Sequence, residues 1–177
     1  MIYKSEEIEY ESLMETAKAM CVAARTAPKA RGVDFIHTMI VTGNQLEEIV
    51  EQTKKFGVTY GQDFCLRDGE NLRKSAALVL IGVSYHQRGL NECCQYCNYT
   101  NCAECAKEDG VCVYDPLDLG IAIGSAVSIA SMAHVDNRVM FSLGKGAMEL
   151  GIMGDKVKMV MGIPLSVSGK APYFDRK

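Results

Sequence analysis

An almost continuous apolar run occupies the middle of the chain and reads Ala76-Ala77-Leu78-Val79-Leu80-Ile81-Gly82-Val83-Ser84. A strand with one face in water alternates apolar and polar residues, whereas a strand buried on both faces shows a run of this kind. We therefore expect residues 76–84 to form a strand buried on both faces, in a mainly central sheet on which helices pack.

The residues before this run predict two helices and one strand. Apolar residues at helical spacing indicate a helix over residues 9–27, and residues 34–42 have the composition of a strand. Asn44 is a suitable N-cap, with Glu47 three residues further on, and Gly57 fits the position just past the end of a helix. The sequence thus predicts a capped helix over residues 44–56.

After the run the elements continue to alternate. Asp115-Pro116 is a strong helix start, and the helix is expected to reach about residue 134. Gly144-Lys145-Gly146 is interpreted as a turn first and as a phosphate site second. The other expected elements are a short helix over 69–75, a strand or extended loop over 138–143, a short helix over 145–151, a strand over 157–163 and an irregular tail over 169–177. We expect one α+β domain over residues 1–177, with a central sheet, packed helices and a cysteine-rich insertion at about 91–115.

Composition narrows the possible classes of function. The formal net charge is −3, and lysine and arginine are scattered without a basic stripe, so no nucleic-acid partner is expected. The amino-terminal residues lack the basic start and apolar stretch of a secretory signal, and charged residues interrupt every long apolar segment. We expect no membrane association and a cytoplasmic location.

Clustered cysteines are the main functional signal. The chain has eight cysteines, and six of them fall between Cys93 and Cys112 in the segment Asn91-Glu92-Cys93-Cys94-Gln95-Tyr96-Cys97-Asn98-Tyr99-Thr100-Asn101-Cys102-Ala103-Glu104-Cys105 and at Cys112 itself. Thiols do not persist as disulfides in a reducing cytosol, so such a cluster indicates metal or redox chemistry. Four thiolates on one short segment are the usual ligands of an iron–sulfur cluster.

Two ligand sets are compatible with the spacing. The preferred set is C-x2-C-x4-C-x9-C, and it contains Cys94, Cys97, Cys102 and Cys112. The rival set begins with the C-x4-C-x2-C spacing of plant-type [2Fe–2S] ferredoxins, and it contains Cys97, Cys102, Cys105 and Cys112. Cys93 is too close to Cys94 for both to ligate one small cluster. A [4Fe–4S] cluster is preferred, and a [2Fe–2S] cluster remains open.

A structural zinc site is the alternative interpretation. Cys94-x2-Cys97 and Cys102-x2-Cys105 resemble two zinc knuckles, and Cys₄ zinc sites are common. Only four residues separate the two pairs, whereas such pairs are usually about 15–20 residues apart. This spacing favours iron–sulfur over zinc, and the zinc hypothesis describes a non-enzymatic protein with a stabilised loop.

The chain also resembles a known family of uncharacterised proteins that contain a ferredoxin domain, and more distantly the nitroreductases. The stretches that carry the resemblance are Ala23-Ala24-Arg25-Thr26-Ala27-Pro28-Lys29-Ala30-Arg31-Gly32-Val33-Asp34, Cys94-x2-Cys97-x4-Cys102, Asp118-Leu119-Gly120-Ile121-Ala122-Ile123-Gly124-Ser125-Ala126, Asp136-Asn137-Arg138, Gly162-Ile163-Pro164 and Tyr173-Phe174-Asp175-Arg176. They are spread over most of the chain.

The nitroreductase resemblance implies a homodimer built through long helices, with FMN at the dimer interface. The turn at Ala27-Pro28-Lys29 would approach the flavin, and the helix that contains Asp118 would face the partner. Residues 1–10 lack the arginine-rich motif with which nitroreductases bind the flavin phosphate. The candidates for phosphate contacts are instead Arg25, Lys29, Arg31 and Arg138.

These observations predict an iron–sulfur electron-transfer protein or oxidoreductase that works with a redox partner protein or a small-molecule electron acceptor. Gly120 and Gly124 place small residues on one stripe of a predicted helix. They predict either close approach to a partner helix or cofactor, or ordinary packing inside the fold.

Overall fold

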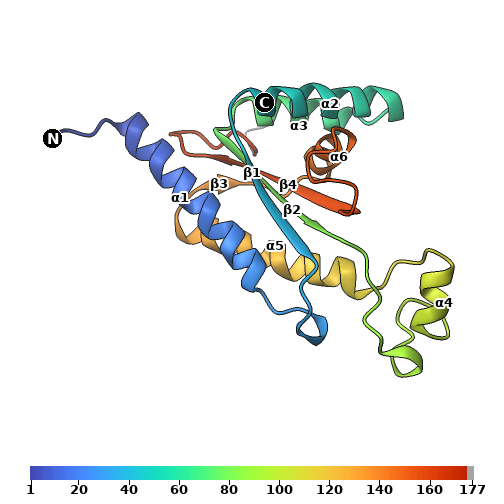
Figure 1. Ribbon diagram of the computed structural model, residues 1–177. Coiled ribbons are helices and arrows are strands. Elements are labelled where there is room, and N and C mark those ends of the chain that lie inside the picture. The colour runs from blue at the N-terminus through green and yellow to red at the C-terminus, as the bar shows by residue number, and fades with distance from the viewer. Residues whose placement is uncertain (175–177) are drawn as a thin grey trace.

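A four-stranded antiparallel sheet, in the order β1-β2-β4-β3, is the centre of the molecule (Figure 1). The structure is a computed structural model that describes residues 1–174, so the last three residues of the expected irregular tail lie outside the described part. The strands are β1 (Ile36–Val41), β2 (Ala77–Val83), β3 (Asp136–Asn137) and β4 (Met159–Ser166). β2 pairs with β1 on one side and with β4 on the other, and all seven of its residues are buried. The expected central strand is confirmed.

Helices cover both faces of this sheet and so bury β2 on both sides, as the apolar run predicts. On one face lie the two long helices α1 (Ser5–Thr26) and α5 (Tyr114–Met132), which pack against each other (Figure 1). The odd-numbered residues of β2, such as Val79 and Ile81, belong to the core on this side. The other face carries α2 (Asn44–Tyr60), α3 (Asp63–Arg73) and α6 (Phe141–Glu149), which pack over Leu78 and Leu80. The alternation of side chains along β2 thus divides the core into two layers.

The cysteine-rich segment leaves the sheet at the end of β2 and returns at the start of α5. It contains a single 3-10 turn, η2 (Asn91–Cys93), and the short helix α4 (Cys102–Lys107). In Figure 1 this segment projects beyond the end of the sheet, beside the start of α5. A second 3-10 turn, η1 (Ala30–Gly32), connects α1 to β1 near the same end of the molecule. No helix in the described part of the chain is long and apolar enough to cross a membrane.

Three expected element boundaries were wrong. Gly43, not Asn44, is the N-cap of α2. The helix continues through Gly57 to end at Tyr60 and is followed by Gly61, which has a left-handed backbone. A side chain at position 57 would bring its Cβ to 2.7 Å from the Cβ of Cys65, so Gly57 permits the close approach of α3 and does not mark a helix end. α3 correspondingly begins before the expected residue 69.

The glycine pair around Lys145 was also misassigned. Gly144 and Gly146 lie inside α6 and not in a turn before it, and residues 141–143, expected as extended chain, form the first turn of this helix. A Cβ at Gly144 would lie 2.0 Å from the carbonyl oxygen of Val160 in β4. Gly144 therefore lets α6 lie directly on the sheet, and Gly146 lets α6 approach Thr53 of α2, where a Cβ would lie 2.2 Å from the hydroxyl oxygen. The turn in which the possible phosphate site was expected is not formed.

Gly120 and Gly124 differ from Gly144. No atom lies within 4 Å of a Cβ built on either of them, and both are exposed on α5. Ordinary close packing within the chain does not explain this stripe. Leu117 and Ile121 on the same helix are 50% and 38% exposed, so the outer face of α5 is both flat and apolar.

Substitution of Gly144 by alanine tests the contact of α6 with β4. We expect Gly144→Ala to lower the free energy of unfolding by about 1–3 kcal/mol, because the added methyl group overlaps backbone atoms that cannot move independently. Urea titration measures the change. Glu149→Ala, at an exposed position of the same helix, is the control and should change stability by less than about 0.5 kcal/mol. Equal stability of both variants and the parent would contradict the contact.

Candidate functional site

Five cysteine side chains line one small cavity in the projecting segment. They are Cys94, Cys97, Cys102, Cys105 and Cys112. The volume of the cavity is about 10 Å³, which is room for about one water molecule, so the side chains leave little free space between them. The cavity brings together all four cysteines of the preferred ligand set, and it also contains Cys105 from the rival set.

The remaining cysteines lie elsewhere. Cys93 is exposed and donates its thiol hydrogen to the carbonyl oxygen of Leu90 at 2.9 Å. Cys21 packs against the core on the α1 side, and Cys65 is fully buried in α3. All three therefore lie apart from the cavity that contains Cys94.

Local interactions fix the shape of the cysteine loop. The side chain of Asn101 caps α4 by accepting a hydrogen bond from the amide of Glu104, which places Cys102 and Cys105 in the two turns of this short helix. Gly110 lies directly beneath the ring of Tyr99, where a Cβ would come within 2.6 Å of a ring carbon. Only glycine permits this contact, and it brings Cys112 back towards α4.

Hydrogen-bond donors are directed at the thiol sulfurs. The amide of Asn91 lies 3.4 Å from Sγ of Cys102, and Nε2 of Gln87 lies 3.8 Å from Sγ of Cys105. Asn91 has a positive φ of 52° and follows a residue of right-handed helical conformation. Gln95, with φ also 52°, follows Cys94 in the same way. Successive backbone amides in such pairs form concave anion-binding sites, including those that hold iron–sulfur clusters.

The protonation of Cys105 depends on this crowding. Burial raises the pKa of the Cys105 thiol, the hydrogen bond from Gln87 opposes the increase, and the neighbouring Cys97 adds to it. The thiol therefore stays neutral until a cation replaces its proton. A metal centre held here by thiolates would displace this proton on binding.

A buried charge network borders the same cavity. Arg88, which also lines the cavity, donates from Nη1 to Asp115 and from Nη2 to Asp118, with both distances equal to 2.9 Å. The exposed fractions of the three side chains are 2%, 0% and 3%. Burial raises the pKa of Asp115, whereas for Arg88 the two carboxylates outweigh burial and raise the pKa, so the guanidinium remains charged.

The network connects the cysteine loop to the rest of the fold. The carboxylate of Asp115 accepts a hydrogen bond from the backbone amide of His86 at 3.1 Å. The backbone amide of Asp115 donates to the carbonyl oxygen of Cys112 at 3.0 Å. Asp118 accepts the amide of Ala30 at 3.0 Å, in the turn that the nitroreductase resemblance places beside a flavin. The two ends of the cysteine segment and the turn after α1 are thus held by one set of charges.

Sequence reasoning missed this network. Asp115 was recognised only as part of a helix start, Asp118 only as part of a family stretch, and Arg88 was not noticed. The one available signal was the spacing of Asp115 and Asp118, which places both carboxylates on the same face of a helix. An isolated arginine in a loop gives no sign that it will be buried.

The four basic residues proposed for phosphate contacts do not assemble into one site within this chain. Arg25 pairs with Asp34 at 2.8 Å, and the ammonium group of Lys29 is buried against the last carbonyl oxygens of α1. Arg31 donates to the carbonyl oxygen of Arg88 at 2.6 Å. Arg138 lies after β3, where it donates to the carbonyl oxygen of Tyr173 and stacks over Phe174. Three of the four therefore surround the turn after α1, and the fourth lies elsewhere.

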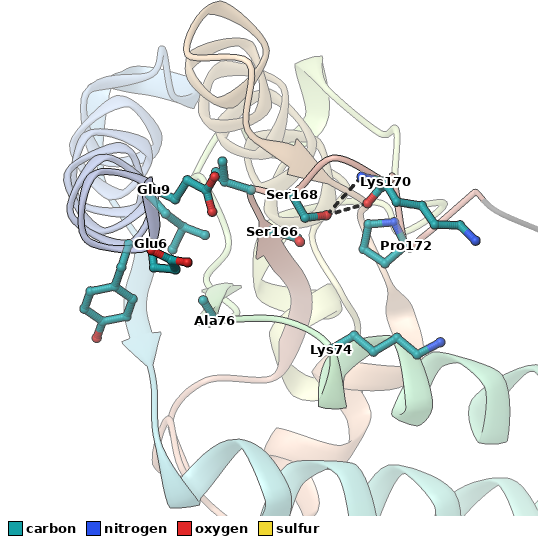
Figure 2. A pocket seen from close by; sticks show the side chains of 11 residues that line it. Glu6, Glu9, Lys74, Ala76, Ser166, Ser168, Lys170 and Pro172 are labelled. Carbon is teal, nitrogen blue, oxygen red and sulfur yellow. Dashed lines mark hydrogen bonds between the residues drawn. The ribbon is translucent and has the colours of Figure 1, made fainter. Parts of the chain in front are cut away.

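A larger cavity of about 460 Å³ lies away from the cysteines, between the first half of α1 and the chain after β4. Figure 2 shows the carboxylates of Glu6 and Glu9 directed from α1 towards Ser166 and Ser168, while the chain of Lys74 extends away from them. None of the residues predicted to hold a cofactor lines this cavity. Its size suits a small ligand, but its chemistry is separate from that of the thiols.

Within residues 1–174, no group of three His, Cys, Asp or Glu side chains is arranged around a single point as one metal ion requires. The thiols of the cysteine cavity surround a common space instead.

Comparison with known proteins identifies the relatives of this chain. A family model described as an uncharacterised protein containing a ferredoxin domain matches residues 108–176. A protein of Archaeoglobus fulgidus, itself uncharacterised, is 38% identical over 99% of this chain and 98% of its own length. The chain belongs to this ferredoxin-domain family. The match to the family model includes Cys112, Asp115 and Asp118 but begins after the other four thiols of the cavity.

The solved structures with a similar fold include proteins named for FMN or a flavin. An oxidoreductase containing FMN superposes with a TM-score of 0.60 and 13% identity, covering 88% of this chain and 67% of the other. The FMN-dependent nitroreductase of Mycobacterium smegmatis, solved with NADPH, also has a TM-score of 0.60 and 13% identity, with 90% and 81% covered. A BluB-like flavoprotein of Clostridium difficile gives 0.56 and 16%, with 95% and 88% covered. The ferredoxin-domain protein thus has the nitroreductase-like α+β fold that the sequence predicts, and family and fold together suggest a redox role.

Removal of one carboxylate tests how much the buried network contributes to the stability of the fold. We expect Asp118→Ala to lower the free energy of unfolding of the reduced, metal-free protein by about 3–5 kcal/mol, because Arg88 keeps a buried charge with one partner lost. Glu51→Ala breaks an exposed pair with Arg73 and should cost less than about 1 kcal/mol. Similar urea midpoints for the two variants would show that the network contributes little to stability.

Proposed function

We propose that this ferredoxin-domain protein binds an iron–sulfur cluster in the cysteine cavity and works as an electron-transfer protein or oxidoreductase. The observation that carries the proposal is the convergence of five thiols from one loop on a single cavity. When bound, such a cluster accepts and donates single electrons at a potential set by its ligands and surroundings. A [4Fe–4S] cluster held by Cys94, Cys97, Cys102 and Cys112 is the preferred form.

Three features support a cluster over a structural zinc ion. Within residues 1–174, no three of the potential ligand side chains are arranged around one point, as a single tetrahedral zinc ion would require. Only four residues separate Cys97 from Cys102, which suits one compact loop around an inorganic core. Amide groups of Asn91 and Gln87 are placed towards thiol sulfurs, and such hydrogen bonds tune the potential of a cluster.

The position of the loop suits exchange of electrons with another molecule. The cysteine segment projects from the sheet, and Cys94, Cys97 and Cys102 are only half-buried (Figure 1). A cluster held there would lie near the surface, within reach of a redox partner protein or a small-molecule acceptor. The buried network of Arg88, Asp115 and Asp118 would keep the base of the loop fixed while electrons are exchanged.

A finer form of the proposal places FMN at the interface of a homodimer. Its support is the FMN named for the structural neighbours and the position of the turn after α1, which is linked through Arg88 to the cysteine cavity. Within one chain, the four basic residues do not form a phosphate site, so no electron-transfer step is assigned to a flavin here. Flavin in the isolated protein would support the FMN proposal. A preparation with a cluster but no flavin would contradict the FMN proposal and leave the cluster proposal standing.

Serine variants of the cysteines test the cluster directly. In anaerobically prepared protein we expect iron, acid-labile sulfide and a visible absorption band. Cys94→Ser, Cys97→Ser, Cys102→Ser and Cys112→Ser should each lose most of the bound iron, because serine oxygen is a poor substitute for thiolate. Cys93→Ser and Cys21→Ser are matched controls and should retain the content of the parent.

The same assays decide between the alternatives. Full iron retention in Cys105→Ser would support the preferred ligand set, whereas loss there with retention in Cys94→Ser would support the rival set. A colourless protein that contains zinc and no iron or labile sulfide would contradict the cluster proposal and favour the structural zinc site.

The outer face of α5 supplies the test of the homodimer. Because Gly124 is exposed and a Cβ built there has no atom of its own chain within 4 Å, Gly124→Gln should leave folding of the protomer intact. We expect the parent to sediment as a dimer and the variant largely as a monomer, since the bulky side chain prevents close approach of the partner's helix. Analytical ultracentrifugation measures both masses. A monomeric parent, or a variant that dimerises as tightly as the parent, would argue against this interface.

A further inference from the structure

We propose that Arg88 is a positioning residue of the cluster site, which donates a hydrogen bond from Nε to a sulfur of the cluster and raises its reduction potential. This inference rests on the proposed function. It concerns a residue that neither the sequence pattern nor the family description assigns.

One of the three guanidinium nitrogens of Arg88 has no hydrogen-bond partner within residues 1–174. Nη1 donates to the carbonyl oxygen of His86 at 2.5 Å and to Asp115 at 2.9 Å, and Nη2 donates to Asp118 at 2.9 Å. The guanidinium carbon lies 4.8 Å from the centre of the Phe35 ring. Among the described residues, the buried Nε atom has no hydrogen-bond partner.

A buried donor without an acceptor is uncommon and calls for an explanation. Arg88 itself lines the cavity that contains the five cysteines. A cluster in this cavity would carry negative charge on its sulfides and thiolates, and these are good acceptors for a cationic N–H group. The residue with the unpartnered donor thus borders the space in which a cluster would supply an acceptor.

The two carboxylates fix the orientation of the guanidinium group of Arg88. Asp115 and Asp118 are three residues apart on α5, and together they hold both terminal nitrogens of Arg88. The side chain therefore has little freedom to rotate, and Nε stays in a fixed orientation. A lysine at this position would keep a positive charge near the carboxylates but would lack the planar group that carries a third donor.

A hydrogen bond from a charged group stabilises the reduced cluster more than the oxidised one, because reduction adds negative charge. Loss of this bond should therefore make reduction less favourable. The carbonyl oxygen of Arg88 also accepts a hydrogen bond from Nη1 of Arg31 at 2.6 Å. The same residue therefore connects the cluster site to the turn after α1.

The decisive experiment compares the parent with Arg88→Lys by redox titration of the anaerobic, cluster-loaded proteins. We expect the equilibrium constant for reduction to fall about tenfold, which is about 59 mV for a one-electron couple. Arg73→Lys is the matched control, since Arg73 lies in a surface network with Glu47, Glu51 and Glu70 and should not change the potential. A merely structural role of Arg88 would not move the potential of a variant that is folded and fully loaded.

A second measurement does not depend on the variant. In the parent labelled with ¹⁵N-arginine, pulsed electron paramagnetic resonance of the reduced cluster should show coupling to an arginine nitrogen, and Arg73→Lys should retain it. If Arg88→Lys does not fold, this coupling alone decides. Absence of the coupling, or an unchanged potential in loaded Arg88→Lys, overturns the inference about Arg88. A parent without iron and labile sulfide overturns the proposed function instead, so the two failures are distinguishable.

Discussion

The salt bridges of Arg88 with Asp115 and Asp118 are the interaction on which the site depends. Three charged side chains are almost fully removed from solvent where the cysteine segment meets the helical layer. Burial of such groups carries a large desolvation penalty, and the penalty is offset only when every charge has a partner of good geometry. Because the partners come from the loop and from α5, the salt bridges hold the start of the cysteine loop against this helix.

The sheet and the helices packed on it form the scaffold that holds the cysteine segment at both of its ends. β2 is buried on both faces and connects directly to the segment, so one end of the cysteine loop starts from the most rigid part of the molecule. The other end enters α5, which packs against α1. Rigid elements therefore support both ends of a loop that is itself irregular, and four of its non-glycine residues have positive φ angles, namely Asn91, Gln95, Asn98 and Asp109. Such a scaffold can hold ligand side chains more precisely than the loop alone.

The sequence predicted the architecture better than the boundaries, and the gathering of the cysteines better than their surroundings. The apolar run at β2 and the crowding of cysteines are local patterns: the run forms the expected central strand, and five of the crowded cysteines line one cavity. Gly57 and Gly144 were misread because a glycine that ends a helix and one that allows another element to approach look identical in sequence. Arg88 was missed for a related reason, since its burial depends on carboxylates 27 and 30 residues away. Tertiary contacts of this kind leave no local pattern.

The central claim is that the thiols of this ferredoxin-domain protein surround an inorganic cluster. X-ray absorption at the iron edge of anaerobically isolated protein is the most direct test. We predict iron bound mainly by sulfur, with a second shell of scattering from neighbouring iron atoms. Iron that lacks iron neighbours, or protein in which the only bound metal is zinc, would contradict this account.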